Sequence, residues 1–237
     1  MNNSSILIVG AERGLGLGLA EFYLSRGWEV FATYYPGSDL ASLEILSKSY
    51  PGQLSSAPID VTDKTRIEPF INQIGVRKFD VIFMIAGIFG PLHQSVLQAT
   101  DTEFQQIMMT NSFGPARLAR HLIPTLSPQG TLCFMTSHRA SIAANDEPGI
   151  GLELYRASKV ALNMLARCIY MDIQGAGHTV LSIHPGWVAT AMGTLDGAVE
   201  AEMDVKTSVE GMADVIEKHR HDNTHLYLDY ENKTWPW

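Results

Sequence analysis

The sequence predicts an α/β protein in which one parallel sheet of about seven strands is covered by helices on both faces. Short apolar runs alternate with stretches of helical spacing along almost the whole chain. Repeated strand–helix units of this kind form parallel sheets. The runs are also continuously apolar, which is typical of strands buried on both faces. A chain of 237 residues suits one such domain, so we expect residues 1–237 to form a single domain.

Each expected strand is a short run rich in apolar residues. The first reads Ile-Leu-Ile-Val, the second Val-Phe-Ala-Thr, and the third, Gln-Leu-Ser-Ser-Ala, is the most polar. The fourth reads Val-Ile-Phe-Met-Ile, and three further runs complete the set. The strands are therefore expected at 6–9, 30–33, 53–57, 81–85, 131–135, 180–184 and 226–228.

The expected helices lie between these runs, where apolar residues recur three and four positions apart. They are expected at 15–26, 39–49, 63–74, 101–123, 155–174 and 205–219. The segment 193–205 is irregular and acidic, which favours a flexible flap over a second domain.

Composition and charge narrow the class of protein. Apolar residues make up 46% and charged residues 18%, so the chain can bury a sizeable core. A formal net charge of −8 with no basic stripe argues against a nucleic-acid partner. The longest apolar runs are too short for a membrane span, and no signal-peptide pattern is present. We expect a cytoplasmic protein in which Cys133 and Cys168, both in apolar segments, are buried thiols.

A glycine-rich turn follows the first expected strand, with Gly10, Gly14 and Gly16 in the run Gly-Ala-Glu-Arg-Gly-Leu-Gly. Glycine lets the backbone bend sharply and approach a ligand closely. The helix that follows offers free N–H groups and a positive dipole to an anion. This setting predicts a pyrophosphate site for a dinucleotide, although such a trio can also serve turning and packing alone. No Gly-Lys-Ser/Thr follows, which sets aside a nucleoside-triphosphatase.

Tyr155 and Lys159 lie four residues apart in an expected helix, so they share one face. A unit charge at ~4 Å and effective dielectric ~20 contributes about 4 kcal/mol. It would lower the phenol pKa by up to ~3 units before burial raises that pKa again. Such a tyrosine can transfer a proton near neutral pH. On its own, such a pair on a helix is usually an ordinary surface contact.

In order, and over nearly the whole length, these motifs resemble those of the short-chain dehydrogenase/reductase family. Asn111, Ser137, Tyr155 and Lys159 match its catalytic tetrad in type and order. More narrowly, the segments 137–142, 155–159 and 184–188 and the ending Trp-Pro-Trp resemble the C-factor-like carbonyl-reductase branch. The resemblance implies a Rossmann-type doubly wound sheet and hydride transfer between a nicotinamide and a carbonyl or alcohol.

The resemblance also implies a role for each member of the tetrad. Tyr155 would be the general acid in reduction and the general base in oxidation. Lys159 would bias Tyr155 electrostatically and hydrogen-bond the nicotinamide ribose. Ser137 would hold the substrate oxygen, and Asn111 would anchor a water that links Lys159 to solvent.

Cofactor contacts follow from the same resemblance, at the glycine turn and after the second, third, fourth and sixth strands. The residues concerned are Gly10, Arg13, Gly14, Leu15, Gly16, Thr33, Tyr34, Asp60, Val61, Ala86, Gly87, Tyr155, Lys159, Pro185, Gly186, Val188 and Thr190. No metal site is expected, because no histidine or cysteine spacing is typical of one.

Two positions depart from the family pattern. Where the family commonly has Asn-Asn-Ala-Gly, this chain has Met-Ile-Ala-Gly at 84–87, so the local support is expected to come from packing. After the second strand, Tyr34 and Tyr35 replace the acid of NAD binders and the arginine frequent in NADP binders. Arg13 could bind a 2′-phosphate, whereas Glu12 brings a negative charge to the same turn. NADP is favoured over NAD.

The leading prediction is an NADPH-dependent reductase of a small carbonyl compound. The alternatives are a catalytically silent dinucleotide-sensing or signalling protein of the same fold, and a structural protein that assembles through its long helices. A homodimer is expected through 101–123 and 155–174, because a helix that is apolar on several faces must bury them. His138 and Arg139 either line the crevice or belong to a solvated loop, and His184 is expected in strand-end packing.

Overall fold

The computed structural model describes residues 4–146 and 151–237, and it confirms the predicted parallel sheet. The described residues form one sheet of seven parallel strands in the order β3-β2-β1-β4-β5-β6-β7. The strand order reverses between β1 and β4, and ligand crevices open outside the carboxyl ends of the strands at such a point. The strands are β1 (Ser5–Val9), β2 (Glu29–Tyr34), β3 (Leu54–Pro58), β4 (Phe79–Met84), β5 (Leu126–Met135), β6 (Thr179–His184) and β7 (His225–Asp229).

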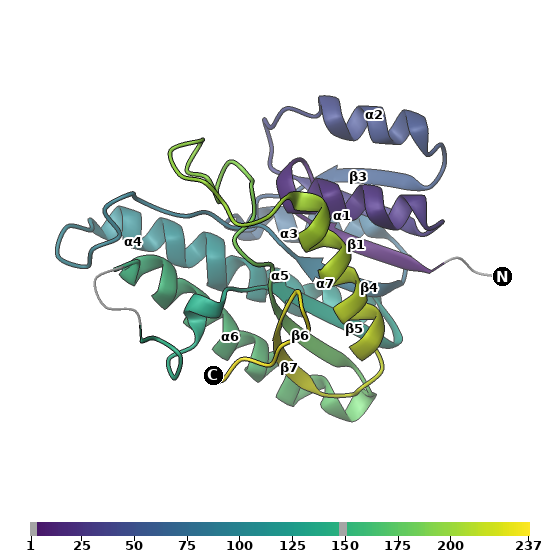
Figure 1. Ribbon diagram of the computed structural model, residues 1–237. Helices are drawn as coiled ribbons and strands as arrows, with labels where there is room; N and C mark the ends of the chain where they lie inside the picture. The colour runs from purple at the N-terminus through teal and green to yellow at the C-terminus, as the bar shows by residue number, and fades with distance from the viewer. Residues whose placement is uncertain (1–3, 147–150) are drawn as a thin grey trace.

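Helices connect the strands and lie on both faces of the sheet (Figure 1). A short 3-10 turn, Lys64–Arg66, precedes α3, so the helix expected at 63–74 forms in two pieces. The helix expected at 101–123 is also divided, and the other expected elements have the predicted type and order, with ends shifted by a few residues. The α-helices are α1 (Gly14–Ser25), α2 (Ala41–Ser49), α3 (Ile67–Ile74), α4 (Asp101–Met108), α5 (Gly114–Leu122), α6 (Glu153–Ile173) and α7 (Val205–His219).

Two apolar cores hold the helices against the sheet. Along β1, Leu7 and Val9 belong to one core, and Ile6 and Ile8 belong to the other. Successive side chains of a strand point to opposite faces. The first core includes residues of α3, α5 and α6, and the second includes residues of α1, α2 and α7. The strands inside the sheet therefore need apolar residues on both faces, which explains their continuous apolar runs, whereas the edge strand β3 is more exposed and more polar.

One wide turn divides the helix expected at 101–123. α4 leads into a π-helical turn, Met109–Phe113, which runs directly into α5. Pro115 has no N–H, so the carbonyl of Asn111, four residues earlier, cannot accept its usual helical hydrogen bond. The π turn adapts the helix to this loss, and apolar spacing alone does not reveal it. Asn111, within this turn, is completely buried.

The two cysteines differ in exposure. Cys133 of β5 is buried as predicted, but Cys168 of α6 is exposed, and the prediction for it was wrong. Cys168 shares a helix face with Met164 and Met171, which are 63% and 51% exposed. An apolar segment does not imply burial here, because α6 carries apolar residues on more than the face that packs on the sheet.

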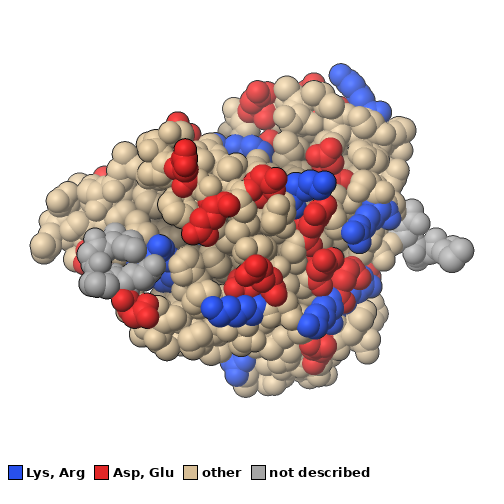
Figure 2. Space-filling model, viewed as in Figure 1, with Lys and Arg blue, Asp and Glu red and all other residues tan. Residues whose placement is uncertain are grey.

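The charged side chains are intermixed on the surface. On the face shown in Figure 2, acidic and basic side chains lie beside one another without a broad region of one sign. Within the described part of the chain, no helix combines the length and the apolar character that crossing a membrane requires.

Candidate active site

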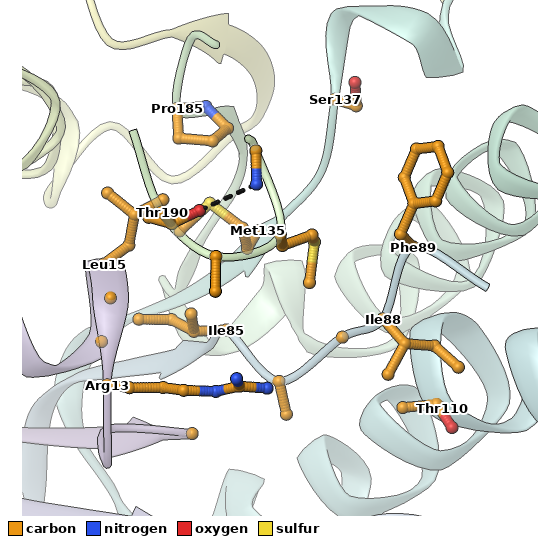
Figure 3. Close-up of a pocket in the computed structure, with 18 of the residues that line it drawn as sticks. Arg13, Leu15, Ile85, Ile88, Phe89, Thr110, Met135, Ser137, Pro185 and Thr190 are labelled. Carbon is orange, nitrogen blue, oxygen red and sulfur yellow. Dashed lines mark hydrogen bonds between the residues drawn. The ribbon is translucent and has the colours of Figure 1, made fainter. Parts of the chain in front are cut away.

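One large cavity opens at the carboxyl ends of the strands, where the strand order reverses. Its volume is about 1720 Å³, above the ~300–1,000 Å³ usual for a small-molecule site. The glycine turn, the ends of β1, β2, β5 and β6, the loop after β4 and the first turns of α6 contribute to its walls. Figure 3 shows Arg13 and Leu15 at one end, and Ser137 and Phe89 at the other. The cavity has room for a dinucleotide and a small second molecule.

The glycine turn is so tight that side chains would not fit at its two ends. Gly10 has a φ of +96°, and a Cβ there would lie 3.0 Å from backbone atoms of Ala86. A Cβ on Gly16 would lie 1.9 Å from the carbonyl oxygen of Gly10. α1 then begins with no side-chain cap and no acidic residue in its first turn. Its first N–H groups are therefore available to an anion such as a pyrophosphate.

Side chains at the ends of β2 and β3 line the cavity near Arg13. Thr33 is completely buried, and its hydroxyl accepts a hydrogen bond from the N–H of Gly10 at 3.1 Å, so it braces the glycine turn. The Asp60 carboxylate accepts bonds from the N–H and the hydroxyl of Thr62 at 2.8 and 2.7 Å, which fix its position. Arg13 is exposed and has no side-chain partner among the described residues.

Tyr155 and Lys159 both line the cavity from α6, as their spacing predicts. The Lys159 Nζ lies 5.9 Å from the centre of the Tyr155 ring and donates to the carbonyl of Met135 at 3.0 Å. The lysine is only 4% exposed, so its charge is held out of water. The ring of Phe89 stacks on that of Tyr155, with the centroids 5.8 Å apart.

Burial dominates the protonation of both side chains. It raises the pKa of Tyr155 to about 12, although a hydrogen bond with Ser137 and the charge of Arg139 act in the opposite direction. Burial also lowers the pKa of Lys159 to about 8. The lowered Tyr155 pKa expected from the lysine charge is therefore wrong for this structure, because desolvation of the phenolate outweighs the nearby charges.

Ser137 follows β5 and precedes a 3-10 turn, His138–Ala140. Its hydroxyl accepts a hydrogen bond from the N–H of Arg139 at 3.2 Å. The buried hydroxyl of Tyr227 in β7 donates to the backbone carbonyl of Ser137. Both bonds hold the serine at the wall of the cavity.

A pair of histidines lies next to Ser137. The Nδ1 of His138 and the Nε2 of His184 are 2.8 Å apart, and the Trp235 ring packs near both. Burial lowers the pKa of His184 well below its usual range, so this ring stays neutral at pH 7. The structure places both histidines on the cavity wall, which decides between the two positions considered for His138.

Asn111 lies behind the cavity wall rather than on it. Its Oδ1 accepts from the N–H of Ile88 at 2.7 Å, and its Nδ2 donates to the carbonyl of Ile88 at 2.8 Å. The same Nδ2 donates to the Ser158 hydroxyl at 3.0 Å. The side-chain amide therefore ties the loop after β4 to α6.

Hydrogen bonds also support the segment 84–87, where packing alone was expected. The N–H groups of Ile85 and Ala86 both donate to the carbonyl of Val9, at 3.0 and 2.8 Å. Together with the bonds of Asn111 to Ile88, these contacts hold the segment against β1 and the π-helical turn.

The loop after β6 forms a further wall of the cavity. The Thr190 hydroxyl accepts from the N–H of Gly193 at 3.1 Å, the dashed line in Figure 3. The indole N–H of Trp187 donates to the Gly193 carbonyl at 2.7 Å, and Val188 pairs with Met203. The segment 193–205, predicted as a flap, is therefore tied at both ends to the loop that begins at Pro185.

The predicted site residues lie together, with one exception: all of them line the cavity except Asn111. Sequence reasoning missed Phe89 and Trp187, which line the cavity, and Gln94, whose side-chain oxygen accepts from the N–H of Tyr155 at 2.9 Å. Phe89 follows the motif segment 84–87 by two residues, and Trp187 lies within the motif segment 184–188, so their positions were available as a signal. Gln94 lies in a loop without periodicity, and nothing in the sequence distinguishes it.

The sheet, the glycine turn at its switch point and the tyrosine–lysine pair define a dinucleotide-binding oxidoreductase of the α/β class. Residues 9–221 match the family model described as enoyl-(acyl carrier protein) reductase. The chain belongs to the short-chain dehydrogenase/reductase family.

Several relatives span most of the chain. The C-signal of Myxococcus xanthus is 32% identical over 171 residues, which cover 71% of this chain and 98% of that protein. A putative short-chain dehydrogenase/reductase from Burkholderia multivorans with bound NADP is 32% identical, with a TM-score of 0.93 and full coverage of both chains. A carbonyl reductase from Pseudomonas aeruginosa PAO1 in complex with NADP is 34% identical, with a TM-score of 0.89 and full coverage of both chains.

Within the described part of the chain, no group of three or more His, Cys, Asp or Glu side chains is arranged to hold a metal ion.

Proposed function

We propose that the protein reduces a small carbonyl compound to an alcohol with NADPH, with Tyr155 as the general acid. The observation that carries this proposal is that Tyr155 and Ser137 both line the cavity and are hydrogen-bonded to each other. Figure 3 shows Ser137 at the end of the cavity away from Arg13 of the glycine turn. A bound nicotinamide cofactor would supply the hydride. The chain itself has to place the carbonyl group and provide the proton.

Ser137 and Tyr155 divide this work. The Ser137 hydroxyl donates a hydrogen bond to the substrate oxygen, as a donor fixed in place before the reaction. Tyr155, which burial keeps neutral, gives its proton to the same oxygen as negative charge develops there. The Lys159 charge lies close enough to stabilise the resulting phenolate, and we assign to Lys159 the contact with the cofactor ribose.

Asn111 serves the return of the proton in this proposal. Its side chain is occupied by Ile88 and Ser158. Its carbonyl cannot accept the usual helical bond, because Pro115 has no N–H. We therefore assign to that carbonyl the water that would link Lys159 to solvent.

The residues of the turn fit a dinucleotide, and the balance of charge favours NADP. Arg13 has no side-chain partner among the described residues, and no acid follows β2 to repel a 2′-phosphate. Against this, one carboxylate oxygen of Glu12 is buried in the turn without a partner. The NADP bound to two relatives of full length supports the choice.

Apolar side chains of the cavity indicate the kind of carbonyl compound. Phe89, Leu152, Trp187 and Met192 line the cavity, and Phe89 stacks on the tyrosine. A small ketone or aldehyde with an apolar or aromatic substituent would pack against these side chains.

The test is the loss of absorbance at the reduced-nicotinamide band, measured with a panel of apolar and polar carbonyl compounds. Consumption of NADPH that depends on an apolar carbonyl supports the proposal. NADPH that stays unconsumed with every member of the panel contradicts it, provided that binding of NADPH is detected in the same sample.

A second candidate is a signalling protein that binds a dinucleotide without turnover. The observation that favours it is the 32% identity to the C-signal of Myxococcus xanthus. Tight NADPH binding together with no carbonyl-dependent consumption would support this alternative.

We further propose a cytoplasmic homodimer of single-domain subunits, with 193–205 as a flap that moves over the substrate. The helices expected at the interface expose Phe104, Phe113, Met164 and Met171, which are 49%, 51%, 63% and 51% exposed. Ile107, Leu118, Leu162 and Ile169 on the same helices are buried in the fold itself. A second subunit would cover the exposed set.

A further inference from the structure

The helix that carries Tyr155 begins without a capping side chain of its own. The N-cap residue of α6 is Leu152, which has a φ of +60° and an apolar side chain that makes no cap hydrogen bond. Leu154 and Tyr155 follow in the first turn, where N–H groups have no helical acceptor and a polar N-cap side chain normally supplies one. Tyr155 thus stands in the part of α6 that needs an outside partner.

Gln94 supplies both missing acceptors from the loop after β4. Its backbone carbonyl accepts from the N–H of Leu154 at 3.3 Å, and its side-chain oxygen accepts from the N–H of Tyr155 at 2.9 Å. Its side-chain nitrogen donates to the carbonyls of Phe89 and Pro91, both at 2.8 Å. With 3% exposure, this amide is a buried group that uses both its oxygen and its nitrogen.

The loop and the helix are joined at further points. The Glu153 carboxylate accepts from the N–H of Val96 at 2.8 Å, so each partner caps an N–H of the other. The backbone carbonyl of Phe89 accepts a hydrogen bond from the Gln94 side chain, and the Phe89 ring stacks on the Tyr155 ring. Gln94 itself has a φ of +54°, a left-handed conformation that persists in a glutamine only where its surroundings fix it.

We propose that Gln94 is a positioning residue that fixes the Tyr155 phenol and the Phe89 wall as one unit. The proposal rests on the proposed function, in which Tyr155 donates the proton. Gln94 does not line the cavity, so it acts through Tyr155 and Phe89 and not on the substrate. Lys159 lies one turn further into α6, beyond the capped groups, and its ribose contact does not depend on Gln94.

This arrangement separates two effects of a substitution at Gln94. Removal of the acceptor frees the first turn of α6, and a displacement of about 1 Å at a reacting group can lower a rate about 10²-fold. Turnover is therefore expected to fall much more than cofactor affinity. A substitution that only weakened the fold would lower both together.

The test compares Gln94→Met with Gln98→Met, a matched control. Gln98 is an exposed glutamine of the same loop, and it does not line the cavity. We expect Gln94→Met to lower kcat by about 10- to 100-fold and to raise the KM of the carbonyl substrate. NADPH affinity should stay within about twofold, and Gln98→Met should match the wild type in all three. A kcat of Gln94→Met equal to that of the control, or a parallel loss of NADPH affinity, would overturn the proposal.

Hydrogen exchange of the wild-type amides gives a readout that needs neither turnover nor a stable variant. The amides of Leu154 and Tyr155 should exchange slowly although they lie in a first helical turn, and Gln94→Met, which removes the side-chain acceptor, should speed the exchange of the Tyr155 amide. Exchange in the wild type at the rate of an unprotected amide would overturn the proposal. If the wild type reduces no carbonyl at all, the proposed function fails, whereas slow exchange at these amides would still show the cap.

Discussion

Lys159→Met should stabilise the protein at neutral pH while removing the charge that the site uses. The lysine is 4% exposed, and burial lowers its pKa from 10.5 to about 8. That difference of about 2.5 units corresponds to about 3 kcal/mol, at roughly 1.4 kcal/mol per unit. The hydrogen bond from Nζ to the Met135 carbonyl is lost, which offsets about 1 kcal/mol. A net gain of about 2 kcal/mol is expected at pH 7.

The dependence on pH identifies the cause of this gain. Between about pH 8 and 10.5 the unfolded chain binds more protons than the folded one, so the stability of the wild type rises with pH in this window. The penalty of the buried charge is complete below pH 8 and disappears as the pH rises through the window. The advantage of Lys159→Met should therefore shrink by about 2–3 kcal/mol between pH 7 and pH 10.

The assay is urea unfolding of the cofactor-free wild type and variant at pH 7, 8, 9 and 10. Lys48→Met is the control, because Lys48 is exposed on α2, and its stability difference should stay within about 0.5 kcal/mol. A stability difference for Lys159→Met that does not change with pH would refute the argument from the buried charge.

Two further predictions concern the cofactor and the assembly. Arg13→Ala should weaken NADPH binding by about 10- to 150-fold, the equivalent of the roughly 1.5–3 kcal/mol of a hydrogen bond to a charged group. NADH binding should barely change, and fluorescence titration of both cofactors measures this. Tighter binding of NADH than of NADPH by the wild type would contradict the choice of NADP. Light scattering at micromolar concentration should show a dimer, and Met164→Glu should weaken its association. A wild-type particle of 26.1 kDa, the mass of one chain, would contradict the predicted dimer.

The fold and the outline of the cavity could be predicted because their signals are local in sequence. The continuous apolar runs follow from burial on both faces, as Ile6 and Leu7 show by entering different cores. The glycine turn is equally local, since a Cβ on Gly16 would collide with the carbonyl oxygen of Gly10 within the same turn. Each of these features needs only neighbouring residues to be recognised.

The remaining features depend on contacts between distant segments. The protonation of Tyr155 follows from burial, which the four-residue spacing to Lys159 does not reveal. The exposure of Cys168 depends on which face of α6 meets the sheet. Gln94 caps a helix 61 residues away, and its loop has no periodic pattern. Such contacts become visible only when the chain is folded.

The most direct measurement is carbonyl-dependent NADPH oxidation by the wild type and by Tyr155→Phe, with NADPH affinity determined for both. The phenylalanine keeps the ring that packs on Phe89 and removes only the hydroxyl. The account predicts that turnover falls by about 10²- to 10⁴-fold, while NADPH affinity stays within a few-fold of the wild type. Turnover by Tyr155→Phe near the rate of the wild type would contradict the role of Tyr155 as the proton donor.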